Sequence, residues 1–196
     1  MNREIRAAQT ATTLTVYQAY SPQIAEPALA AGRFVPPFKR ERMTWIKPSF
    51  LWMAYRCGWA EKEGQERVLA LDLTREGFEW ALGHASLSHF ESGTYADADA
   101  WKQAKRASPV RIQWDPERTL QLGPRSIRAI QVGLSGEAVD RYVDDWIVAI
   151  RDVTPLMREV HAAVRAGNED AAHALLPVET PYPLSAALAR RIGASP

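Results

Sequence analysis

Cysteine and histidine are scarce in this chain. Its 196 residues include one cysteine, Cys57, and four histidines. A single cysteine excludes a disulfide framework and a cysteine-based zinc site. The histidines lack the HExxH or HxH spacing that marks a metal site. We therefore expect neither a disulfide nor a bound metal ion.

Long apolar runs and an excess of one charge are also lacking. No stretch approaches the ~18 apolar residues of a membrane span, and the opening sequence MNREIRAAQTATT has no apolar run typical of a signal peptide. Lys and Arg number 24 against 23 Asp and Glu, a net charge of +1. Long-range attraction of nucleic acid is not expected, whereas a local basic patch is compatible with this balance. We expect a cytoplasmic protein without a membrane partner.

The common phosphate and hydrolase motifs are missing as well. The chain has neither GxGxxG nor GxxxxGK[ST], so Rossmann and P-loop sites lack support. It has no GxSxG nucleophile elbow. Cys57 falls late in an expected helix, where a lowered thiol pKa is not expected.

Tryptophan, by contrast, is abundant. Seven tryptophans are spread along the chain. One interpretation is a core built from large aromatic side chains. The other is that some indole faces line a pocket for a flat ring such as a nucleobase.

The residue pattern alternates between expected strands and helices. Strands are expected at 13–20, 43–46, 67–73, 110–114, 125–132 and 145–151, with a turn at 115–118. Helices are expected at 22–31, 49–57, 75–83, 97–106, 135–143, 155–166 and 169–176. This order favours an α+β fold with a mixed, mostly antiparallel sheet of about six strands. We expect one domain over 1–184 and a loosely packed tail over 185–196, with one helical turn at 185–191.

The segment 38–59 combines cations with aromatic rings. It holds five basic residues, Lys39, Arg40, Arg42, Lys47 and Arg56, and the tryptophans Trp45, Trp52 and Trp59. A cation can hold a phosphate while an indole stacks on a base. A phosphate beside Lys47 would also meet the free N–H groups of the helix that Pro48 opens. The alternative is a solvated basic face over a tryptophan-containing core.

Two acidic residues and one histidine are further candidates. Asp144 and Asp145 begin the sixth expected strand and so point to opposite faces, which excludes a carboxylate pair. One of them can face a pocket, or both can be a charged strand entrance. His89 is a candidate acid–base group, although a lone histidine is more often structural.

Four long strings resemble one catalogued family. VYQAYSPQIAEPALAAGRFVPPF, ERMTWIKPSFLWMAYRCGW, SPVRIQWDPER and IQVGLSGEAVDRYVDDWIVAIRDVTP are similar to the bacterial and fungal family named domain of unknown function 4291. The likeness covers roughly residues 3–184. The family name implies no activity.

A second resemblance is to ADP-ribosyltransferase domains. The strand, helix and glycine of VYQAYSPQIAEPALAAGRF, the block MTWIKPSFLWMAYRC and the late strand DWIVAI resemble three blocks of that fold in the same order. The resemblance puts Gln18 where the first-strand histidine stands and Trp45 where a tyrosine stacks on nicotinamide. It puts Asp145 where the catalytic glutamate stands. All three residues depart from the family pattern.

This second resemblance implies an enzyme that uses NAD. Asp145 and Gln18 would be catalytic, with Asp145 orienting the reacting ribose and Gln18 bonding the ribose or carboxamide. The expected cofactor-binding residues are Trp45, Arg42, Lys47, Thr44, Tyr20 and Trp52, with Arg42 and Lys47 holding phosphate. Two alternatives stay open: a module that binds RNA or a nucleotide without turnover, and a protein–protein adaptor with Trp and Arg at its interface. The oligomeric state is left open.

Overall fold

The computed structural model describes residues 2–195, which form an α+β fold as the sequence predicts. The strands are β1 (Arg6–Ala7), β2 (Thr13–Tyr20), β3 (Thr44–Ile46), β4 (Arg67–Thr74), β5 (Ala85–Leu87), β6 (Val110–Arg118), β7 (Pro124–Leu134), β8 (Ile147–Asp152) and β9 (Thr180–Pro181). The helices are α1 (Pro22–Ala31), α2 (Phe50–Cys57), α3 (Arg75–Gly83), α4 (Ala98–Ala107), α5 (Glu137–Arg141), the π-helical turn η1 (Tyr142–Trp146), α6 (Thr154–Arg165), α7 (Glu169–Leu175) and α8 (Ala186–Ile192). Within this range no helix has the length and apolar character needed to cross a membrane.

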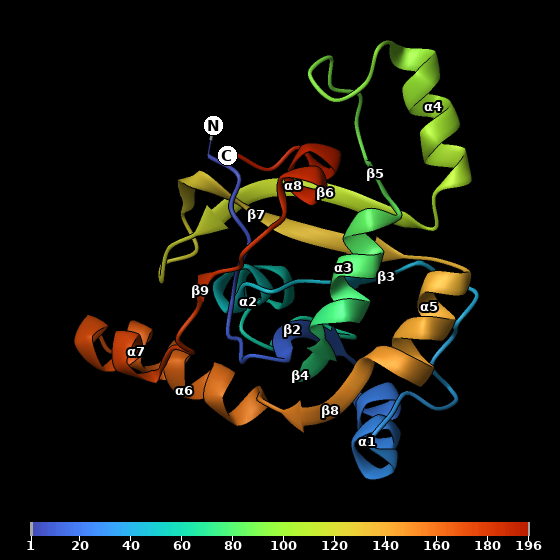
Figure 1. Cartoon of the computed structure of the whole chain (residues 1–196). Coiled ribbons are helices and arrows are strands. Elements are labelled where there is room, and N and C mark those ends of the chain that lie inside the picture. The colour runs from blue at the N-terminus through green and yellow to red at the C-terminus, as the bar shows by residue number, and fades with distance from the viewer. Residues whose placement is uncertain (1, 196) are drawn as a thin grey trace.

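The strands are divided between two main sheets (Figure 1). One sheet has the order β2-β4-β8 and the other the order β3-β7-β6-β5, while β1 and β9 form a short ribbon. The pairings are antiparallel apart from β5 with β6. The antiparallel character expected from the sequence is therefore confirmed, and the expected single sheet is divided into two.

The two main sheets meet at a backbone pair. The Tyr17 amide in β2 donates to the Lys47 carbonyl at 2.7 Å, and the Lys47 amide donates back to the Tyr17 carbonyl at 3.3 Å. Lys47 directly follows β3, and α2 begins three residues later. Helix α2 then packs against β2 of one sheet and β6 of the other.

The core consists of two hydrophobic clusters. The larger one includes Leu14, Leu71, Ile112, Val132 and Trp146, and so joins residues of both main sheets. A smaller cluster contains apolar side chains of α2 and α6. Trp52, Trp59, Trp114 and Trp146 are buried, whereas Trp45, Trp80 and Trp101 are half-buried. Most of the tryptophans are therefore structural.

The C-terminal segment packs into the fold, so the expected loose tail is wrong. Figure 1 shows the two ends of the chain side by side, and the Arg3 amide donates to the Ser195 hydroxyl at 2.9 Å. Ile192 in α8 is fully buried, and the Trp114 indole donates to the Ile192 carbonyl at 2.7 Å. Helix α8 thus supplies both an apolar side chain and a hydrogen-bond acceptor to the interior.

Two expected boundaries differ from the structure. The turn expected at 115–118 is part of β6, where a register shift between Pro116 and Arg118 accommodates the proline. The sixth expected strand begins at Ile147 instead of Asp145, because residues 142–146 form the turn η1. The short strand β5 was not expected.

A close approach at Gly77 tests this packing. A Cβ atom there would lie 2.3 Å from Cγ of Trp146, so Gly77→Ala forces the α3–η1 contact apart. We expect Gly77→Ala to lower the free energy of unfolding by about 1–3 kcal/mol, as overpacking does. The control is Gly93→Ala, since nothing lies within 4 Å of a Cβ at that position. Urea denaturation of both variants measures the difference, and equal stability would contradict the packing described.

Candidate functional site

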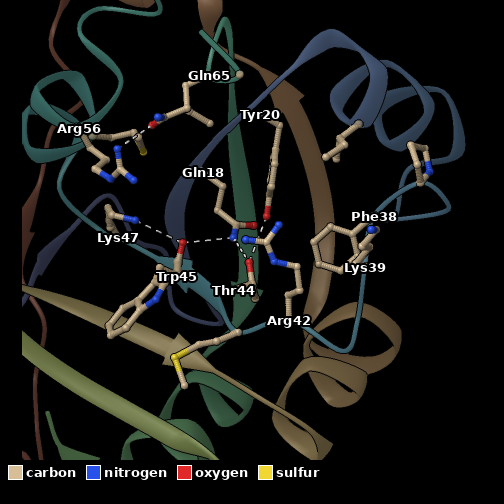
Figure 2. Close-up of a pocket in the computed structure, with 16 residues that line it drawn as sticks. Gln18, Tyr20, Phe38, Lys39, Arg42, Thr44, Trp45, Lys47, Arg56 and Gln65 are labelled. Carbon is tan, nitrogen blue, oxygen red and sulfur yellow. Dashed lines mark hydrogen bonds between the residues drawn. The ribbon is translucent and has the colours of Figure 1, made fainter. Parts of the chain in front are cut away.

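A cavity of about 420 Å³ opens where β2, β3 and α2 meet (Figure 2). Its size suits a small ligand, since such sites span ~300–1,000 Å³. Residues of the two strands, the loop before β3 and helix α2 supply most of its wall. The lining residues are Gln18, Ala19, Tyr20, Ile24, Pro37, Phe38, Lys39, Arg42, Met43, Thr44, Trp45, Lys47, Met53, Arg56, Gly64 and Gln65.

Most of the site residues predicted from the sequence line this cavity. Those that do are Gln18, Tyr20, Arg42, Thr44, Trp45 and Lys47. Trp52 lines a neighbouring hollow instead. Asp145 lines neither of the two. The segment 38–56 is therefore a wall of a cavity and not a uniformly solvated face.

A buried polar network forms one side of the cavity. Gln18, which is 3% exposed, donates from Nε2 to the Thr44 hydroxyl at 2.6 Å and to the Trp45 carbonyl at 3.2 Å. Its Oε1 accepts from the Tyr142 hydroxyl at 2.7 Å. The Tyr20 and Thr44 hydroxyls lie 3.0 Å apart, and burial raises the pKa of Tyr20 to about 12. Because protein groups bond both ends of the Gln18 amide, Gln18 positions β3.

Lys47 lies deeper than any other cation of the cavity. It is 5% exposed, and its Nζ donates to the Trp45 carbonyl at 3.4 Å. Figure 2 shows Lys47 and Gln18 converging on that carbonyl. Among the residues that the structure describes, this carbonyl is the one hydrogen-bond acceptor of Nζ. Burial, aided by the nearby Arg56, lowers the pKa of Lys47 to about 7.

The cavity carries positive charge without a compensating carboxylate. Lys39, Arg42, Lys47 and Arg56 line it, and its lining residues include no Asp or Glu. Lys39, Arg42 and Arg56 are exposed, and Arg56 donates to the Gln65 side chain at 3.3 Å. A concave wall of one charge sign concentrates the electrostatic potential and attracts counter-charged ligands. The arrangement is suited to an anion.

A second hollow of about 490 Å³ adjoins the first. The two share Trp45, Lys47 and Arg56, so these three side chains stand between them. The remaining lining residues are Trp52, Tyr55, Gln113, Asp115, Arg118 and Gln131. Arg118 stacks 3.5 Å above the centre of the Tyr55 ring. The amides of Gln113 and Gln131 donate to the Asp115 carboxylate.

The Trp45 indole packs against a glycine of the neighbouring strand. Trp45 pairs with Gly133 of β7, and a Cβ atom at Gly133 would lie 3.0 Å from the indole and from Met43 Sδ. The missing side chain therefore lets the indole approach the backbone of β7. The half-buried indole borders both hollows.

The start of α2 is closed to a phosphate, contrary to the sequence-based expectation. The Phe50 amide donates to Oε1 of Glu179 at 2.7 Å, and the Trp52 amide donates to the Ser49 hydroxyl at 3.0 Å. Burial raises the pKa of Glu179 to about 8. Protein acceptors thus occupy two of the amides that an anion would need.

Asp145 does not join the cavity, so its expected place beside Gln18 and Trp45 is wrong. It lies on the exposed side of η1, between the buried Val143 and Trp146. Its neighbour Asp144 forms an ion pair with Arg40, with Nη–Oδ distances of 2.6 and 2.7 Å. The cause is the π-helical turn, which replaces the strand start that would have aimed Asp145 inward.

Other candidate reactive groups are also outside the cavity. His89 is exposed and borders neither hollow. Cys57 is buried, and burial raises the pKa of its thiol. Within residues 2–195, no group of three or more His, Cys, Asp or Glu side chains is arranged to hold a metal ion.

Sequence comparison identifies a family. The family model described as Domain of unknown function (DUF4291) matches residues 4–182. This range contains every lining residue of both hollows and ends before α8. No curated protein matches the chain significantly. The likeness to ADP-ribosyltransferases stays a prediction.

The Gln18 network gives a prediction on stability. Gln18→Leu removes the acceptor of the buried Tyr142 hydroxyl and one donor to the Thr44 hydroxyl. We expect it to lower the free energy of unfolding by about 1–3 kcal/mol, the cost of an unsatisfied buried polar group. The double variant with Tyr142→Phe should be less destabilised than the sum of the single variants. Strict additivity in urea denaturation would contradict the coupling.

Lys47 gives a prediction on pH. Its pKa of about 7 in the folded state lies below the value of 10.5 for an ordinary lysine. Between these values the unfolded chain binds more protons, so this group makes stability rise with pH, and its cost is largest below pH 7. Lys47→Met removes the cost. We expect its stability advantage over the wild type to shrink from pH 6 to pH 10, measured by urea denaturation, and a constant difference would overturn this.

Proposed function

The chain belongs to the DUF4291 family, and we propose that its cavity between β2, β3 and α2 binds an anionic ligand with a flat ring, of the nucleotide class. One observation carries this proposal. Three exposed cations and the buried Lys47 amine, with no carboxylate, surround a concave space that the Trp45 indole borders. Phosphate and nucleobase are the two groups of a nucleotide that such a wall recognises.

The phosphate would be held by side chains at the rim. Arg42 and Arg56 are exposed lining residues, and each guanidinium can donate two parallel hydrogen bonds to phosphate oxygens. Lys39 adds a third cation on the same side as Arg42, from the loop before β3. Arg40 is not available, because Asp144 and Asp140 already accept its hydrogen bonds.

The ring would stack on an aromatic side chain. Trp45 is half-buried between the hollows, and Tyr20 and Phe38 line the same cavity. Stacking of a base on an aromatic side chain contributes ~1–3 kcal/mol. A ligand that extends past Trp45 would enter the second hollow, where Arg118 and Tyr55 offer a further cation and ring.

The proposal is binding without ADP-ribosyl transfer. Transfer from NAD needs a carboxylate beside the ribose, and Asp145 lies on an exposed turn outside the cavity. NAD is accordingly one of the nucleotides to test as a ligand, together with AMP, ADP and short RNA. A protein–protein adaptor is the alternative if none of them binds.

Titration calorimetry with AMP, ADP and NAD tests the proposal. We expect Arg42→Ala and Arg56→Ala each to weaken the affinity of the best ligand by about 10–100-fold, the scale of a lost charge-assisted hydrogen bond. Raising the salt concentration should weaken it further.

The matched control is Arg158→Ala, which removes an exposed arginine of α6 that lines neither hollow. We expect its affinity to equal that of the wild type. Absence of binding at millimolar nucleotide, or an equal loss in all three variants, would refute the proposal.

A further inference from the structure

Lys47 combines features that nucleotide binding does not require. It lies at the wall between two hollows and is almost fully buried. Its Nζ has one long hydrogen bond at 3.4 Å and lies 5.6 Å from the centre of the Trp52 ring. An ammonium group has three donors and is strongly hydrated in water. Placing it here with one weak acceptor and one aromatic face costs folding free energy. A rim arginine would hold an anion without this cost.

We propose that Lys47 is a nucleophilic lysine that forms an imine with a small aldehyde or ketone carrying a phosphate or carboxylate group. The inference goes beyond nucleotide binding, because it assigns covalent chemistry to the cavity. Arg42 and Arg56 would hold the anionic group of the carbonyl compound at the rim. The carbonyl carbon would then reach Nζ at the inner wall.

The reaction needs no further reagent. The lone pair of the neutral Lys47 amine attacks the carbonyl carbon, and a proton passes from nitrogen to oxygen to give a carbinolamine. Loss of the hydroxyl as water, with the second nitrogen proton, leaves a C=N bond. The sum is amine plus carbonyl compound giving imine plus water, with no change of oxidation state.

The surroundings of Nζ favour the neutral amine. Burial and the positive charge of Arg56 in α2 lower the pKa of Lys47 to about 7, while the Asp115 carboxylate in β6 and Cys57 in α2 act weakly in the other direction. Gln113 and Gln131 occupy the Asp115 oxygens. A desolvated lysine beside a second cation is a known way to activate an amine at neutral pH.

The other lysines serve as internal references. Lys39 and Lys62 are exposed. Lys102 forms an ion pair with Asp99 at 2.9 Å, and Lys105 lies 4.7 Å from the centre of the Trp101 ring. None of these environments activates an amine in the way described for Lys47.

The test uses pyridoxal 5′-phosphate as the probe, because it joins an aldehyde to a ring and a phosphate. The wild-type protein is treated with it, reduced with borohydride and mapped by peptide mass spectrometry. We expect Lys47 at pH 7 to be labelled at least ~10-fold faster than the other four lysines, from its larger neutral fraction. Its labelling rate should reach half its maximum near pH 7.

Three comparisons sharpen the result. Pyridoxal without the phosphate should label Lys47 more slowly, because the rim arginines lose their partner. Lys47→Arg keeps the charge and should abolish the selective label. The urea-unfolded wild type should label all five lysines at similar rates, which shows that the selectivity comes from the fold.

Labelling in proportion to exposure, or an unlabelled Lys47 in the folded wild type, would overturn the inference. Nucleotide affinity is measured separately on the same protein, so the two proposals fail independently. Selective labelling without nucleotide binding would reject only the proposed function. Nucleotide binding without selective labelling would reject only the nucleophilic lysine.

Discussion

The backbone pair between Tyr17 and Lys47 is the constraint on which the site depends. It joins an edge of one main sheet to the residue after β3 in the other. The Lys47 backbone is held in this pair, and its side chain lines the cavity and the adjoining hollow. Gln18, next to Tyr17, then fastens β3 through Thr44 and the Trp45 carbonyl. The cavity and its innermost cation thus follow from one junction.

The same region holds polar groups that cost stability. Lys47 is buried with one long hydrogen bond, and Glu179 is held against the start of α2 with its pKa raised to about 8 by burial. Burying such groups is unfavourable unless their partners compensate. Folds that retain them commonly do so at functional sites. The segment that follows β3 therefore contains groups that lower stability, as functional sites often do.

The sequence predicted the parts of the site that depend on local pattern. The segment 38–56 puts cations, tryptophans and a helix start close together along the chain, and Arg42, Trp45 and Lys47 do line one cavity. The partners that these residues find far away along the chain could not be predicted from the sequence. Tyr142 donates a hydrogen bond to Gln18 from 124 residues away, inside a π-helical turn that the residue pattern does not mark. Glu179, near the C-terminus, likewise accepts a hydrogen bond from the Phe50 amide at the start of α2, where the sequence predicted a phosphate.

The charge of the cavity distinguishes between chemistries that its shape alone would allow. Cleavage of a nicotinamide ribosyl bond develops positive charge on the sugar, and cations close by would raise the energy of that transition state. Lys39, Arg42 and Arg56 would stabilise negative charge instead, such as the phosphate or the acid group of the ligands proposed above. Lys47 differs from these three cations, because its burial lowers its pKa and so favours the neutral amine. A wall that is cationic at the rim and carries a partly neutral amine at its inner end would attract an anion and then offer it a nucleophile, as proposed above.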